Sequence, residues 1–145
     1  MRPDLISKRV VRALLIPLML LGAGAESFAT SITLEGQNKG DTNNWFGGNL
    51  QGWQELDMIP CRVHWVSAPG SNQPVTLIFE HQNNGVPGIQ NLFYFTSSSN
   101  VVFSSLPTLI APPGAKMWSY TFTVDILDAQ PAYVFFCARL AAGAP

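Results

Sequence analysis

The segment Trp53–Val66 concentrates side chains that are capable of chemistry. It contains two of the four tryptophans, one of the two cysteines, two carboxylates, one arginine and one of the two histidines. Such groups act together only when the folded chain brings them to one place. Whether they converge therefore depends on the strands and loops that carry them.

Hydrolytic chemistry has little support in this chain. Its two histidines, His64 and His81, each lie inside an alternating strand pattern, with no nucleophile-elbow sequence nearby. Glu55 and Asp57 are two residues apart, so an extended segment places both carboxylates on one side, and glycoside hydrolases use such pairs. Glu80 is a third candidate, but the other acidic residues are scattered. We predict no catalytic residues and keep a small glycoside hydrolase as the least favoured alternative.

Metal binding also has weak support. Asp41, Asn43 and Asn44 supply oxygen atoms at a spacing that begins like a calcium loop. The bidentate glutamate that completes such a loop is missing, and Asp and Asn are equally typical of a turn. The histidines and cysteines lack the spacing of a zinc site. We expect no cofactor and keep these three residues as weak calcium candidates.

Three tryptophans are candidates for binding a partner. Trp45, Trp53 and Trp118 lie beside segments rich in Gly, Asn or Pro, whereas Trp65 alternates with apolar residues and is predicted to be in the core. A partly exposed indole can stack on a sugar or anchor a protein, although it can also simply cover one end of the fold. The candidate binding residues are Trp45, Trp53, Trp118, Glu55 and Asp57.

Alternating apolar and polar residues predict an all-β fold. No window after residue 30 shows helical periodicity, and turn residues separate short segments rich in β-branched and aromatic side chains. This pattern favours an antiparallel β-sandwich of about seven to eight strands over a small barrel. The proline-rich segment Leu106–Lys116 is predicted to be a connection. The predicted strands are Ser31–Glu35, Met58–Ser67, Val75–His81, Ile89–Thr96, Val101–Ser104, Ser119–Leu127 and Ala132–Arg139.

The same alternation suggests a disulfide. Cys61 shares a face with Val63 and Trp65, and Cys137 shares one with Phe135. Both faces are predicted to point inward, so the first long strand and the last strand would meet in the core. A bridge between Cys61 and Cys137 closes a long loop and would contribute on the order of 4 kcal/mol. Two free buried thiols are the alternative.

Residues 1–29 have the three-part plan of a secretory signal peptide. A basic start precedes the apolar run Ala13–Ala25, and Ser27-Phe28-Ala29 supplies small residues for cleavage. The run is shorter than the roughly 20 apolar residues that span a bilayer. We therefore predict a secreted protein, located outside the cell, on its surface or in the periplasm. Residues 30–145 form one domain without a membrane span.

The charge of this domain excludes one class of partner. The full chain has eight basic and nine acidic residues. The first 29 residues take away four basic and two acidic ones, which leaves four against seven and a net charge of −3. Four scattered cations do not make a nucleic-acid surface. A weakly charged surface suits copies of the same chain, another surface protein or a glycan as partner.

Three segments resemble parts of a known class of module. Trp53–Val63, Gly88–Leu92 and Cys137–Ala144 are similar to segments of β-rich modules in large secreted or surface-exposed bacterial proteins. The resemblance implies an immunoglobulin-like sandwich without a catalytic site, and it transfers no functional residues. This chain ends just after the last segment, where those proteins continue into further domains. We predict a structural, adhesive or self-associating module at the cell exterior, with a tryptophan-based carbohydrate-binding module as the alternative.

Overall fold

The computed structural model describes residues 31–66 and 69–145, and in these residues it is all-β with no helix. The predicted signal peptide lies outside the described residues. Among the described residues no helix is long and apolar enough to cross a membrane. The strands are β1 (Ser31–Gly36), β2 (Met58–Val66), β3 (Gly70–Glu80), β4 (Gln82–Asn83), β5 (Val86–Pro87), β6 (Ile89–Ser97), β7 (Val101–Ile110), β8 (Met117–Ile126) and β9 (Ala132–Leu140).

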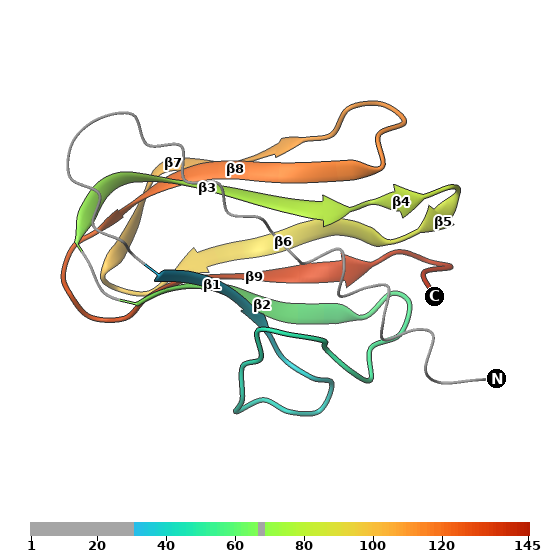
Figure 1. The fold of residues 1–145 in the computed structure, drawn as a ribbon, viewed down its shortest axis with the longest axis horizontal. Helices are drawn as coiled ribbons and strands as arrows, with labels where there is room; N and C mark the ends of the chain where they lie inside the picture. Colours follow the sequence, from blue (N-terminus) through green and yellow to red (C-terminus); the bar gives the residue numbers. More distant parts are fainter. Residues whose placement is uncertain (1–30, 67–68) are drawn as a thin grey trace.

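Two antiparallel sheets form the body of the domain. Sheet A has the strand order β1-β2-β9-β6, and sheet B has the order β3-β8-β7. Figure 1 shows them as two layers, with the short β4–β5 hairpin beyond the end of β3. Every pairing is antiparallel. The arrangement is consistent with a β-sandwich and confirms the predicted fold class at that level.

The core lies between the two sheets and follows the period-two alternation of the strands. In β2 the predicted inner face is confirmed, because Ile59 and Trp65 are fully buried. In β8 the inner positions Phe122 and Val124 are buried, while the intervening threonines face outward. Burying a large apolar side chain contributes about 1.5–3 kcal/mol, so these alternating residues are a main source of stability.

The predicted inner face of the last strand is wrong, and so is the disulfide. In β9 the buried residues are Val134 and Phe136, whereas Phe135 and Cys137 are half-buried on the outer face. Cys61 is in the core, so the two cysteines lie on opposite faces of neighbouring strands and are not bonded. Burial raises the pKa of both thiols, which keeps them protonated near neutral pH.

Strand β7 is longer than predicted. It continues through Pro107 to Ile110, a segment that was predicted to be a connection. Proline is tolerated because β7 pairs only with β8 and forms the edge of sheet B. Register shifts occur on both sides of Ser105, between Phe103 and Thr108, and accommodate the irregular stretch.

The face assignment of β9 predicts a stability difference between two adjacent phenylalanines. Phe136→Ala leaves a cavity in the core and is expected to lower the free energy of unfolding by about 3–5 kcal/mol. Phe135→Ala is expected to cost less than half as much. Urea denaturation followed by circular dichroism measures both. If Phe136→Ala does not fold, Phe136→Leu and Phe135→Leu replace the two alanine variants. A larger loss of stability at Phe135 than at Phe136 would contradict the assignment of these residues to the two faces of β9.

Candidate functional site

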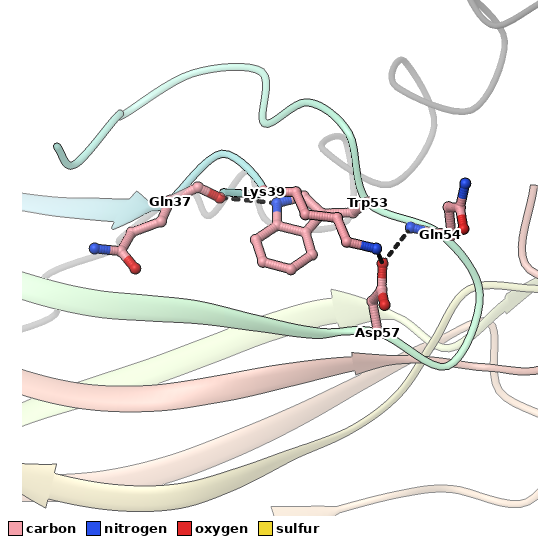
Figure 2. Close-up of polar contacts among 5 residues, drawn as sticks. All are labelled: Gln37, Lys39, Trp53, Gln54 and Asp57. Atoms are coloured by element: carbon pink, nitrogen blue, oxygen red, sulfur yellow. Dashed lines mark hydrogen bonds and ion pairs between the residues drawn. The ribbon is translucent and has the colours of Figure 1, made fainter. Parts of the chain in front are cut away.

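The loop between β1 and β2, residues 37–57, uses two of the predicted binding residues to hold itself in place. The Trp53 indole Nε1 donates to the backbone oxygen of Gln37 at 2.8 Å. The Asp57 carboxylate accepts from Lys39 Nζ at 2.7 Å and from the backbone N–H of Gln54 at 2.8 Å. Figure 2 shows these contacts within one compact group. Trp53 and Asp57 therefore anchor the loop.

The remaining candidate carboxylates also have local partners. Glu55 accepts the backbone N–H of Gly143, which ties the loop to the segment after β9. A carboxylate oxygen of Glu80 lies 4.0 Å from Lys116 Nζ. The carboxylates of Glu55, Asp57 and Glu80 thus each contact a different partner, and these contacts are structural.

Hydrogen bonds lower the pKa of two acidic side chains in this loop. For Asp57 the first cause is the hydrogen bond from Lys39, followed by that from Gln54. For Asp41 it is the side-chain amide of Asn44, followed by the backbone N–H of Asn43. Asp41 Oδ1 accepts the backbone N–H groups of Asn43 and Asn44, as in an Asx turn.

The Asp41 turn does not resemble a calcium site. Asn44 directs its amide nitrogen toward both carboxylate oxygens of Asp41, at 3.2 and 3.0 Å, and a nitrogen donor is not a calcium ligand. Among residues 31–66 and 69–145 no group of three or more His, Cys, Asp or Glu side chains is arranged to hold a metal ion. The geometry of Asp41, Asn43 and Asn44 therefore favours a turn.

Trp118 is engaged in a stack of aromatic rings beside the core. Its ring lies 3.5 Å from that of His81 with an interplanar angle of 7°, and it meets Phe79 edge-on. The Nδ1 atom of His81 lies 3.1 Å from the carbonyl oxygen of Ile89. A carbonyl only accepts, so Nδ1 carries the proton and the ring orientation is fixed.

Trp45 belongs to a cluster on the outer face of sheet A, which we call the aromatic face. The guanidinium of Arg62 lies 4.5 Å from the Trp45 ring and 4.6 Å from the Tyr133 ring. Arg62 also pairs with the carboxylate of Glu35. Each cation–π contact contributes about 0.5–1 kcal/mol or more. The aromatic face consists of Glu35, Trp45, Arg62, His64, Tyr133 and Phe135.

Strand pairing and the loop together assemble the aromatic face. Glu35, Arg62 and Phe135 stand in one row across β1, β2 and β9. Two backbone hydrogen bonds between Gly36 and Phe46 return the loop to the sheet edge, which places Trp45 over Arg62. The sequence interpretation missed Tyr133 and Phe135 because it placed them in the core. Arg139 lies an even number of residues after Tyr133 and Phe135 and so shares their face of β9. Its charge was the signal in the sequence that this face points outward.

The outer face of sheet B carries a shallow depression of about 480 Å³, which we call the trough. Thr76, Thr121 and Thr108 form one row across β3, β8 and β7. Leu106 borders the trough and is 74% exposed. The lining residues, none of which is charged, are Pro74, Val75, Thr76, Ser105, Leu106, Thr108, Thr121, Phe122 and Thr123.

Edge strand β7 next to the trough is rich in exposed apolar side chains. Val102, Leu106, Leu109 and Ile110 are all exposed, and no residue of the strand is charged. The sequence interpretation missed this surface because its prolines suggested a connection. No family model, curated protein or solved structure matches the chain. Its function is therefore inferred from these surfaces.

The ion pair in the β1–β2 loop predicts a pH-dependent stability difference. Asp57→Asn is expected to lower the free energy of unfolding at pH 7 by about 1 kcal/mol, because the pair is partly exposed. The folded-state pKa of Asp57 is lowered, so its contribution is present above the unfolded value of about 3.9 and is lost as pH falls through the folded pKa. Urea titrations between pH 7 and pH 2 should show the gap close on acidification.

Lys39→Met is the matched control for this prediction. It removes the other partner of the same pair, so its cost and that of Asp57→Asn should not add in the double variant. A stability gap that is independent of pH, or fully additive costs, would contradict the assignment of Asp57 to the loop anchor.

Proposed function

We propose that this chain is a secreted, non-enzymatic β-sandwich module that self-associates and has a structural or adhesive role at the cell exterior. The observation that carries the proposal is edge strand β7, which has no charged residue and exposes the apolar side chains of Val102, Leu106, Leu109 and Ile110. Apolar edges and patches of this kind are typical of protein–protein contacts. The contacts of Glu55, Asp57 and Glu80 support a non-enzymatic role.

The type of sandwich is part of the proposal. Its long strands form one four-stranded and one three-stranded sheet, as in a constant-type immunoglobulin sandwich. This division agrees with the resemblance of the sequence to such modules. The strand order has one difference from that fold. Here the last strand, β9, lies between β2 and β6, and β7 is at the edge of sheet B. We therefore propose an immunoglobulin-like module in size and strand division, with its own strand order.

Self-association predicts a mass that depends on concentration. Sedimentation velocity of the exported chain across a wide concentration range should show a weight-average mass that rises above that of the monomer. High salt should not abolish the association, because β7 carries no charge that salt could screen. A monomer at every concentration would exclude self-association.

Trp45 supports a carbohydrate-binding module as the second candidate. Of the three tryptophans predicted to bind, it is the one placed on an outer sheet face beside other rings and charged groups. Trp53 and Trp118 are occupied by the loop anchor and by the His81 stack. A half-buried indole next to hydrogen-bonding side chains suits one face of a sugar ring.

Glycan titration monitored by tryptophan fluorescence tests the second candidate. Trp45→Ala is expected to abolish the fluorescence change because it removes the stacking surface. Phe46→Ala is the matched control, since Phe46 is the next residue and is exposed but makes no ring contact among the described residues. Equal effects of the two variants, or binding that survives in Trp45→Ala, would contradict a sugar site at Trp45.

A further inference from the structure

The trough on sheet B has a projecting side chain and a hollow next to each other. Leu106 lies within the second register shift of β7, between Ser105 and Thr108, where the strand stops following β8 residue by residue. Such irregularities redirect a side chain that a regular strand would place elsewhere. Leu106 is 74% exposed, and the threonine row beside it contains only small side chains. A hollow and an apolar projection thus lie next to each other on one face.

Four of the hydroxyl groups at this face, those of Ser104, Ser105, Thr108 and Thr123, already have hydrogen-bond partners within the sheet. Ser105 Oγ accepts the backbone N–H of Thr123 at 2.8 Å, and Ser104 Oγ donates to Thr123 Oγ1 at 2.8 Å. Thr108 Oγ1 donates to the carbonyl oxygen of Leu106 at 3.1 Å. A buried polar group is costly only when it lacks a hydrogen-bond partner. An apolar side chain can therefore cover these hydroxyls at little cost.

The absence of charge on the trough restricts the partner. The lining has no charged side chain, although residues 30–145 carry a net charge of −3. A two-fold contact centred on the trough places the trough against its own copy, so a charged lining would repel its copy and an uncharged one does not. The aromatic face is less suited to such a contact, because Arg62 and Glu35 would meet their own copies.

We propose that the partner at the trough is a second copy of this chain, and this inference rests on the self-association proposed above. Two B sheets pack face to face around a two-fold axis, and Leu106 of each copy enters the trough of the other. Packed sheets lie about 10 Å apart, a spacing that an interdigitated leucine fills. Edge-to-edge pairing through β7 is disfavoured by Pro107 and by the register shifts, which interrupt a continuous ladder.

Two charged substitutions test the face contact. Leu106→Asp puts a charge on the projecting side chain, and Thr121→Arg fills the hollow from the central strand β8. Each is expected to weaken the dimer by about tenfold or more, measured as the dissociation constant by sedimentation equilibrium. Leu127→Asp is the matched control, because Leu127 is 60% exposed and lies outside the trough. Its dissociation constant should equal that of the unmodified chain.

The outcomes separate this inference from the proposed function. If the unmodified chain is a monomer throughout, both fail. If the unmodified chain associates and Leu106→Asp associates equally well, self-association stands and only the proposed contact between two B sheets fails. If Leu106→Asp weakens the dimer but Thr121→Arg does not, the copies pair along the β7 edge and the face contact is overturned. Circular dichroism establishes that each variant is folded, and the uncharged Leu106→Ala, expected to show a smaller loss, replaces any variant that is not.

Discussion

The pairing of β9 between β2 and β6 is the constraint on which the rest of this domain depends. It brings the last strand next to the first long one, and the β8–β3 pairing does the same in sheet B. Both pairings join distant parts of the chain, so their loop-closure entropy must be overcome before the core forms. Once β9 is in place, its alternation directs Val134 and Phe136 into the core and Tyr133 and Phe135 onto the aromatic face.

The strands were predictable wherever one face is clearly polar. In β8, threonines alternate with apolar residues, and in β2 the positions of Arg62 and His64 identify the outer face, so both inner faces were assigned correctly. In β9 both faces carry aromatic residues, and periodicity alone cannot choose between them. The expected disulfide favoured the wrong choice, although Arg139, two residues after Cys137, shares its face and indicated the other.

The candidate site was less predictable, because its residues contact partners that lie far away in the sequence. Trp53 and Asp57 have the side chains of a binding site, but Gln37 and Lys39 on the opposite side of the loop engage them. The exposed apolar surface of β7 was not predicted from the sequence for another reason. Proline usually indicates a connection, and the sequence does not reveal that this strand has a neighbour on one side only, where proline is tolerated.

The two outer faces differ in chemistry, and this difference connects the proposals. On sheet A, a cation, its carboxylate partner and several rings are stacked on one another, which leaves polar groups next to aromatic surface. On sheet B, the trough has no charged side chain, and several of the hydroxyl groups beside it are hydrogen-bonded within the sheet. Contact between copies through sheet B leaves both aromatic faces uncovered, on opposite sides of the dimer. Two weak sites on one dimer bind a surface that carries many copies of a ligand more tightly than one site alone does, because binding at the second site is then intramolecular. The proposed self-association through one sheet would therefore strengthen the proposed adhesive role of the other.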